Sequence, residues 1–281
     1  MMSYSNTRVG VPKLYDGCGH GSNDSVTLKP VKGGVGDDDP VSTPSHVFIQ
    51  NKTKTQKRDE GKLVGSTWFT FMGTFNVRTI REDYKRLELA TQFIRNGLEV
   101  LGIQEHRIVH EEPIRIEKFK GGVSLITVSA WRNGAGAATG GVGFMLSSKA
   151  HQAISLIKPY GSRVINISFN GNPRLTVITV YSPTEAATTE EAEDFHNTLR
   201  QAIADVPAHH LLLVLGDMNA RLGQESVEDR RWYFHPRTNR NGELLRDTAQ
   251  ECDMDITNTR FRKKKSKMWT HLSDGTLTKG Q

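Results

Sequence analysis

The chain has 281 residues, of which 36% are hydrophobic and 26 are glycine, which is enough for one or two globular domains. Its net charge of +6 and pI of about 9.3 fit a polyanionic partner, although a solvated basic surface gives the same values. Two cysteines, Cys18 and Cys252, exclude a disulfide framework, and no apolar run approaches the ~20 residues of a membrane span, so we expect an intracellular protein without a membrane element.

Residues 1–62 have the composition of a disordered tail. Glycine, serine, aspartate, lysine and proline dominate "GCGHGSNDSV", "VKGGVGDDDPVSTPS" and "NKTKTQKRDEGK", and the short run "HVFIQ" is too small to fold alone. Cys18 and His20 are a potential metal pair, but two ligands in such a tail are usually incidental. We therefore expect one folded domain over residues 63–281.

That domain begins with a strand, a helix and a second strand. The segment "STWFTFMGTFNVRT" predicts a strand that ends near Asn76, and "LEVLGIQEHR" predicts a buried strand that ends at Glu105. Between them, "REDYKRLELATQFIRNG" has helical periodicity, with Gly97 as its stop. The expected inner face of this helix consists of Leu87, Leu89, Ala90, Phe93 and Ile94.

The middle of the chain predicts mainly strands. "VSLITVSAW" and "GVGFMLSS" have the pattern of strands, and "RNGAGAATGGVG" between them predicts a flexible loop whose Gly141 and Gly143 start the second strand. The loop lacks the spacing of a nucleotide-binding glycine motif, and a strand follows where that motif needs a helix. "RVINISFNGNPRLTVITVYSPT" predicts a hairpin, because two β-branched runs flank the turn "NGNP".

The last third alternates helices with strands. "TTEEAEDFHNTLRQAIADV" predicts a helix capped by Thr189, and "NGELLRDTAQECD" predicts another. The inner face expected for the first helix is Phe195, Leu199, Ile203 and Val206. A buried strand starts at Leu211, and "MDITNTRF" and "KMWTHLS" predict two more. Because a hairpin interrupts the alternation, the pattern favours a layered α/β fold with mixed sheets over a purely parallel one.

Several apolar strands end in a polar residue. These residues are Asn76, Glu105, Tyr181, Asp217 and Asn219. Taken singly, each has a simpler explanation, since Asp-x-Asn after glycine is a common turn and a lone glutamate is usually solvated. Strand ends that share one rim of a sheet are, however, where α/β proteins build their sites. We therefore expect these side chains to gather around one site.

The order of these motifs resembles the endonuclease/exonuclease/phosphatase superfamily of magnesium-dependent phosphodiesterases. The matching motifs are N-x-R after the first strand, Q-E after the second, Y-x-P, and G-D-x-N after a long apolar strand, over about Trp68 to Gln281. "GTFNVRT", "VYSPT", "GDMNA" and "ITNTRF" are most similar to endonuclease domains of non-LTR retrotransposons and to domesticated craniofacial development protein 2-like proteins. The resemblance implies a four-layer α/β sandwich with two mixed β-sheets flanked by helices, with its last strands missing.

The resemblance also implies a role for each residue. Glu105 would hold Mg²⁺, or Mn²⁺ in its place, with Asn76 beside it. Asp217 would orient or deprotonate the attacking water, Asn219 would fix the scissile phosphate, and Tyr181 would hydrogen-bond that phosphate. These residue types suit the chemistry, because Mg²⁺ takes oxygen ligands and neutral donors stabilise a phosphate without adding negative charge.

Basic side chains near these motifs suggest contacts with DNA phosphates. Arg78 follows the first strand, and "RFRKKKSK" contains Lys263, Lys264 and Lys265. Such side chains give salt-dependent affinity that is blind to sequence, although a solvated hairpin tip has the same composition. His106 and His110 have a metal-like spacing, but they lie in a loop, and a zinc role is the weaker reading.

The chain departs from the family pattern after "TLTKGQ". Family members continue with I-D-Y and S-D-H strands, whose Asp–His pair supports catalysis, and His271 in "WTHLS" does not replace that pair. We therefore expect this chain to be C-terminally truncated and weakly active or inactive, since loss of a catalytic histidine costs orders of magnitude.

Three functions compete at this point. The first is a retroelement-type DNA endonuclease, which we expect to be monomeric and nuclear. The second is a lipid phosphodiesterase of the same superfamily, and the third is a catalytically dead domesticated fragment that acts as a binding protein. The motif wording and basic charge favour the first, and the absent motifs favour the third.

Overall fold

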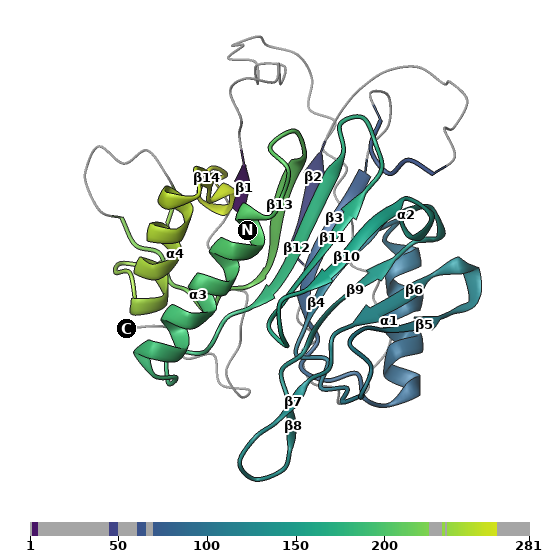
Figure 1. Ribbon diagram of the computed structural model, residues 1–281, viewed down its shortest axis with the longest axis horizontal. Helices are drawn as coiled ribbons and strands as arrows, with labels where there is room; N and C mark the ends of the chain where they lie inside the picture. The colour runs from purple at the N-terminus through teal and green to yellow at the C-terminus, as the bar shows by residue number, and fades with distance from the viewer. Residues whose placement is uncertain are drawn as a thin grey trace, which may run out of the picture.

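The structure is a computed structural model that describes residues 2–4, 45–49, 61–65, 70–224, 232–233 and 235–262 (Figure 1). Its strands are β1 (Met2–Tyr4), β2 (Ser45–Ile49), β3 (Thr70–Asn76), β4 (Val100–Gln104), β5 (Arg115–Lys118), β6 (Ser124–Thr127), β7 (Trp131–Arg132), β8 (Ala138–Thr139), β9 (Val142–Leu146), β10 (Ile154–Pro159), β11 (Val164–Phe169), β12 (Leu175–Tyr181), β13 (Leu211–Asp217) and β14 (Met254–Asp255). Its helices are α1 (Asp83–Arg95), α2 (Ser148–Gln152), α3 (Thr189–Ala204) and α4 (Arg240–Glu251), with 3-10 turns η1 (Lys120–Gly122) and η2 (Thr257–Thr259).

Two six-stranded mixed sheets form the centre of the fold. One has the order β10-β11-β12-β13-β1-β14, and the other has the order β2-β3-β4-β9-β6-β5. Each contains a parallel pair, β12 with β13 in the first and β3 with β4 in the second, among antiparallel neighbours. The predicted mixed α/β class is therefore confirmed.

The apolar side chains divide into three clusters that define four layers. One cluster lies between the two sheets and joins residues such as Phe144 of β9 and Ile167 of β11. A second joins the outer face of the first sheet to α3 and α4, and a third joins the outer face of the second sheet to α1. Figure 1 shows α3 and α4 on one side of the sheets and α1 on the other. The order of layers is thus helix, sheet, sheet, helix.

Two expectations about the helices are wrong in detail. Thr188, not Thr189, caps α3, and its hydroxyl and the Glu191 carboxylate form a reciprocal capping box. In α1, the sequence expectation placed Leu87 and Ile94 on the inner face, but they are 56% and 52% exposed. Ala90 and Phe93 are buried as expected, and Arg86, which was not expected there, is buried with them. The helical period was correct, but the choice of face was wrong for Leu87 and Ile94.

Several short elements also differ from the sequence expectation. The glycine-rich segment expected to be a flexible loop forms the β7–β8 hairpin, which projects from the body in Figure 1. The strand expected over "MDITNTRF" is only the two-residue β14, followed by η2. β5, α2 and β10 had no sequence prediction, because their apolar periodicity is weak.

The division at residue 62 stays a prediction. Within residues 1–62 the structure describes β1, β2 and residues 61–62, and the two strands pair with β13 and β3 respectively. The Cys18–His20 pair and the expected "KMWTHLS" strand lie outside the described residues. Among the described helices, none is long and apolar enough to cross a membrane.

Candidate active site at the strand ends

The two parallel strand pairs bring their carboxyl ends to one place. In the second sheet Asn76 is paired with Gln104, the residue before Glu105. In the first sheet Tyr181 is paired with Asp217. Gly216 permits the close approach of β12 and β13, since a Cβ there would lie 2.1 Å from the Val180 carbonyl oxygen.

The Asn76 amide joins the two sheets at this point. Its Nδ2 donates to Glu105 Oε1 at 2.8 Å and to Asp217 Oδ2 at 3.0 Å. The two carboxylate oxygens are therefore no farther apart than the sum of these distances, although they come from different sheets. The expected gathering of Asn76, Glu105 and Asp217 is present in the fold.

Glu105 accepts three hydrogen bonds from side chains. Tyr181 Oη donates to Oε1 at 2.9 Å and Arg107 Nη2 to Oε2 at 2.9 Å, in addition to the Asn76 amide. Burial raises the pKa of the Glu105 carboxyl, but the hydrogen bonds from Asn76, Arg107 and Tyr181 outweigh it, so the net pKa is lowered. Glu105 is thus a carboxylate at neutral pH, as a metal ligand must be.

Tyr181 is held as a phenol. Burial raises its pKa, and the charge and hydrogen bond of Glu105 raise it further. Arg163 also lies near the ring, and its guanidinium carbon is 5.6 Å from the Tyr181 ring centroid and 4.2 Å from that of Trp131. Burial lowers the pKa of Arg163. The phenol can therefore donate a hydrogen bond, and a tyrosinate nucleophile is disfavoured.

Asn219 fixes the loop after β13 against the loop after β12. Its backbone N–H donates to Asp217 Oδ1 at 3.0 Å, and its Nδ2 donates to the Ser182 carbonyl at 2.8 Å. The Ser182 N–H in turn donates to the Asp217 carbonyl at 2.9 Å. Both oxygens of the Asp217 side chain thus accept a hydrogen bond, and its orientation is set from two sides.

Unusual backbone conformations concentrate here. Five described non-glycine residues have positive φ, and four of them, Arg78, Glu105, Arg107 and Asn219, are at these strand ends. Such conformations cost of order 1–3 kcal/mol each and persist only where the surrounding structure fixes them. Their clustering around Glu105 and Asp217 makes this rim the candidate functional site.

Of the basic residues predicted to contact DNA phosphates, only Arg78 is among the described residues. The Arg78 N–H donates to Asn76 Oδ1 at 3.0 Å, so Arg78 lies directly beside the cluster. Lys263, Lys264 and Lys265 lie outside the described residues, and their DNA contact stays a prediction.

His106 and His110, which were considered as zinc ligands, make other contacts. His106 is fully buried, with Nε2 3.0 Å from the Val128 carbonyl oxygen, and the Ile108 N–H donates to its Nδ1. His110 Nδ1 lies 2.9 Å from the Glu112 carbonyl oxygen. Both nitrogens of His106 are therefore engaged by the main chain, which explains this histidine structurally.

Sequence reasoning missed three contributors to this rim: Arg107, Trp131 and Arg163. A basic residue after a strand is usually solvated, so the sequence alone gives Arg107 no signal. Trp131 and Arg163 contact each other across distant parts of the chain, and no local pattern signals such a contact. The positive φ values also had no signal, since Glu and Arg rarely adopt them.

The donor set fits a hard divalent cation. Glu105 and Asp217 supply carboxylate oxygens, and Asn76 supplies an amide between them. Mg²⁺ needs only one or two carboxylates, because it keeps several waters and takes further oxygens from a phosphate. Among the described residues no group of three or more His, Cys, Asp or Glu side chains could hold a metal.

Comparison with curated proteins supports the resemblance that the motifs indicate. Over 222 residues the chain is 27% identical to craniofacial development protein 2 of Bos taurus, and the match covers 76% of this chain. The chain is similar to craniofacial development protein 2. The Tragulus javanicus protein of that name is also 27% identical over 222 residues. This chain spans 35% of the bovine craniofacial development protein 2 and 36% of the second. No family model matches the chain.

Solved structures also resemble parts of the fold. The endonuclease domain of TRAS1, a telomere-specific non-LTR retrotransposon, is 14% identical with a TM-score of 0.42, covering 64% of this chain and 71% of that one. The AP endonuclease LMAP from Leishmania major is 13% identical with a TM-score of 0.46, covering 64% and 66%. The 3'-5' exonuclease NExo from Neisseria meningitidis is 16% identical with a TM-score of 0.45, covering 64% and 70%.

Proposed function

We propose that the chain is a Mg²⁺-dependent phosphodiesterase that nicks DNA, as a retroelement-type endonuclease does, and leaves a 3′ hydroxyl. The observation that carries this proposal is the convergence of Glu105 and Asp217 on one Asn76 amide nitrogen. Two carboxylates this close repel each other unless donors or a cation neutralise them. A site that holds them together at a rim is suited to a cation and an anionic substrate.

Glu105, with Asn76 beside it, would hold the cation, and Mn²⁺ would substitute for Mg²⁺. The bound cation would neutralise the phosphate and stabilise the leaving oxygen during in-line displacement. Asp217 would orient the attacking water or take its proton, because its carboxylate is fixed by Asn76 and by the Asn219 N–H. A positioned base of this kind contributes about 10²–10⁴-fold.

The neutral side chains would hold the phosphate. The Tyr181 phenol stays protonated because burial and Glu105 raise its pKa, and its one proton would turn from Glu105 to a phosphate oxygen as negative charge develops there. The Asn219 amide would supply a second donor from the neighbouring loop. Neither group adds negative charge to the site, which an anionic substrate requires.

DNA is the substrate that the charge distribution supports best. The chain carries a net charge of +6, Arg107 pairs with Glu105, Arg163 lies near the Tyr181 ring, and the Arg78 backbone is bonded to Asn76. Arginine side chains on such a rim give phosphate contacts that do not depend on base sequence. A DNA substrate implies a nuclear location, and a monomer suffices because all the named groups come from one chain.

A plasmid-nicking assay tests the proposal. The 281-residue chain should convert supercoiled plasmid to open circles only slowly with Mg²⁺, because it lacks the S-D-H motif, and EDTA should stop the reaction. Asp217→Ala should lower the rate by about 10²–10⁴-fold because it removes the proposed base. Asp205→Ala, which removes an aspartate at the end of α3 that pairs with Lys158, should leave the rate unchanged.

The competing readings give different results in the same assay. A folded chain that binds DNA but never nicks it, with Mg²⁺ or Mn²⁺, would contradict the proposal and support a binding protein. Hydrolysis of phosphoinositide or sphingomyelin vesicles with intact plasmid would support a lipid phosphodiesterase. Nicking that survives in Asp217→Ala would show a contaminating nuclease or another site.

A further inference from the structure

The amino end of α4 lies against both loops of the proposed active site. Asn239 caps this helix, and its Oδ1 accepts hydrogen bonds from the Gly242 N–H at 2.9 Å and from the Arg221 N–H at 2.8 Å. Gly242 allows the contact, because a Cβ there would lie 2.2 Å from the Arg221 carbonyl oxygen. The start of α4 is thereby fixed to the segment that follows Asp217 and Asn219.

Asn241, in the first turn of α4, joins the two loops directly. Its Nδ2 donates to the Pro183 carbonyl at 2.9 Å and to the Asn219 carbonyl at 3.2 Å. Pro183 is two residues after Tyr181, and Asn219 is two residues after Asp217. A single amide therefore connects the chain just beyond the phenol to the chain just beyond the carboxylate.

Arg240 sets the orientation of this amide. Its Nε and Nη2 donate to Asn241 Oδ1 at 3.3 and 3.2 Å, which directs Nδ2 toward the two carbonyls. The same guanidinium donates to the Ala187 and Thr184 carbonyls at 2.7 and 3.3 Å. Asn241 is only 1% exposed, so water cannot replace a lost hydrogen bond at low cost.

We infer that Asn241 is a positioning residue that orients the side chains of Tyr181 and Asp217 by linking the loops that follow them, while the β12–β13 ladder sets their register. The inference rests on the proposed function, because these two side chains are its phosphate donor and its base. Asn241 does not touch the reacting groups itself. Its effect passes through the Pro183 and Asn219 carbonyls, so its loss should misplace the donor and the base relative to each other.

Two variants of Asn241 and one matched control test the inference. Asn241→Ala removes the amide, and Asn241→Asp keeps its shape but replaces the donor with an oxygen that repels both carbonyls. Thr248→Val is the control, because Thr248 is also fully buried in α4 and its hydroxyl hydrogen-bonds His196 of α3 at 2.8 Å, away from the loops. All three variants lose a buried hydrogen bond of the same helix, but only two lose the link.

The kinetic readout separates positioning from general stability. Both Asn241 variants should lower kcat by about 10- to 100-fold with little change in KM, since misplacing reacting groups by about 1 Å costs up to that much. Thr248→Val should lower the melting temperature and leave kcat of the folded enzyme unchanged. If Thr248→Val lowers kcat as much as Asn241→Ala does, Asn241 has only a structural role.

Hydrogen exchange gives a second readout that does not need activity. The Ser182 and Asn219 N–H groups, which donate to Asp217, should exchange faster in Asn241→Ala than in the wild type or Thr248→Val. Wild-type protection of both groups that persists in Asn241→Ala would overturn the inference. If the wild-type chain fails to nick DNA, the proposed function fails, and the exchange result still decides whether Asn241 links the loops.

Discussion

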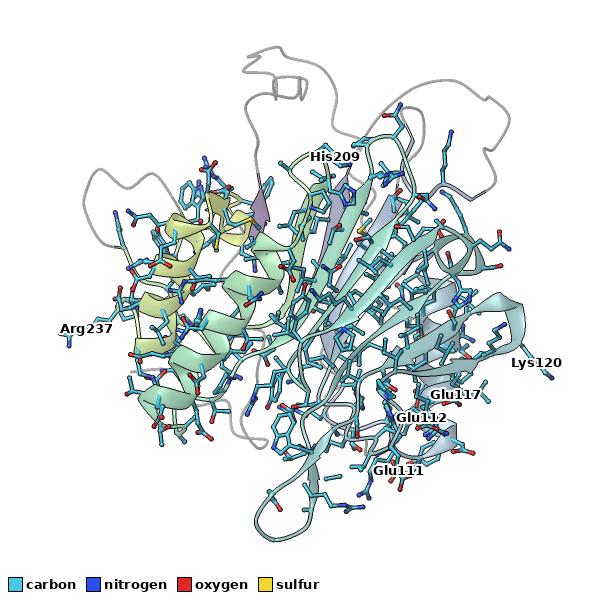
Figure 2. All side chains as sticks on the ribbon, in the orientation of Figure 1. Glu111, Glu112, Glu117, Lys120, His209 and Arg237 are labelled. Carbon is cyan, nitrogen blue, oxygen red and sulfur yellow. The ribbon has the colours of Figure 1, made fainter. Side chains whose placement is uncertain are left out.

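The two ends of β13 differ in what they carry: the proposed active site is at the carboxyl end, and a cavity is at the amino end. The carboxyl end carries Asp217, whose oxygens are engaged by Asn76 and Asn219. The amino end opens on a cavity of about 390 Å³, lined by residues that include His210, Leu212 and Cys252. Figure 2 shows His209, at this amino end, at the top of the molecule, far from Glu111 and Glu112 at the bottom.

The amino end has a cavity, but its groups are not arranged for chemistry. Burial raises the pKa of the Cys252 thiol, which keeps it protonated and weakly nucleophilic. Burial also lowers the pKa of His210, whose Nδ1 is occupied by Thr176 at 2.8 Å. At the other end, carboxylates, donors and positive φ values converge. The converging hydrogen bonds are therefore the reason for placing the proposed site at the carboxyl end.

The largest effect that tests this contrast is expected at the carboxyl end. Glu105→Gln keeps the shape of the side chain but removes the charge that would hold the cation. Nicking should fall by about 10²–10³-fold, the scale of losing one preorganised electrostatic contact. The Mg²⁺-induced rise in melting temperature should disappear as well. A variant that nicks and binds Mg²⁺ normally would show that Glu105 is not the metal ligand.

A smaller effect concerns the pH dependence of stability. Burial lowers the pKa of His106 from 6.5 to about 4, so the unfolded chain takes up the proton first as the pH falls. The stabilising contribution is complete above pH 6.5 and is lost as the pH falls from 6.5 towards about 4. His196, whose pKa is also lowered by burial to about 4, contributes in the same range.

Urea unfolding at several pH values measures this contribution. His106→Gln should reduce the slope of the free energy of unfolding against pH by up to about 1.4 kcal/mol per pH unit between pH 4 and 6.5. His210→Gln, at the cavity end, should change the slope less. If both variants change the slope of the free energy of unfolding against pH equally, the expected difference between His106 and His210 is wrong.

The smallest effect is expected in the cavity wall. Ile203→Val removes one methylene from a side chain that lines the cavity and is 8% exposed. The free energy of unfolding should fall by about 0.5–1.5 kcal/mol. The nicking rate of the folded protein should stay the same. A change in rate without a change in stability would mean that the cavity end takes part in the reaction.

The sequence predicted the strand ends because a buried strand leaves a plain signal. Asn76, Glu105, Tyr181 and Asp217 each follow or end an apolar run, and parallel pairing brings such ends together. Arg163 and Asn241 leave no such signal, because their partners are distant in the chain and are in part backbone carbonyls. The expectation that Leu87 faces inward in α1 is wrong, because only the packed structure shows that Arg86 is buried there.

The ladder between β12 and β13 has a consequence for how the chain tolerates change. Tyr181 and Asp217 are opposite each other because seven consecutive residue pairs, from Leu175–Leu211 onward, hold the strands in phase. A longer connection between β12 and β13 through α3 would not separate the Tyr181 phenol from the Asp217 carboxylate. A slip of one strand against the other by a single residue would turn one of these side chains to the wrong face of the sheet. The register of the two residues is therefore set by the buried strands, whereas the loops beyond them depend on Asn241 for their position.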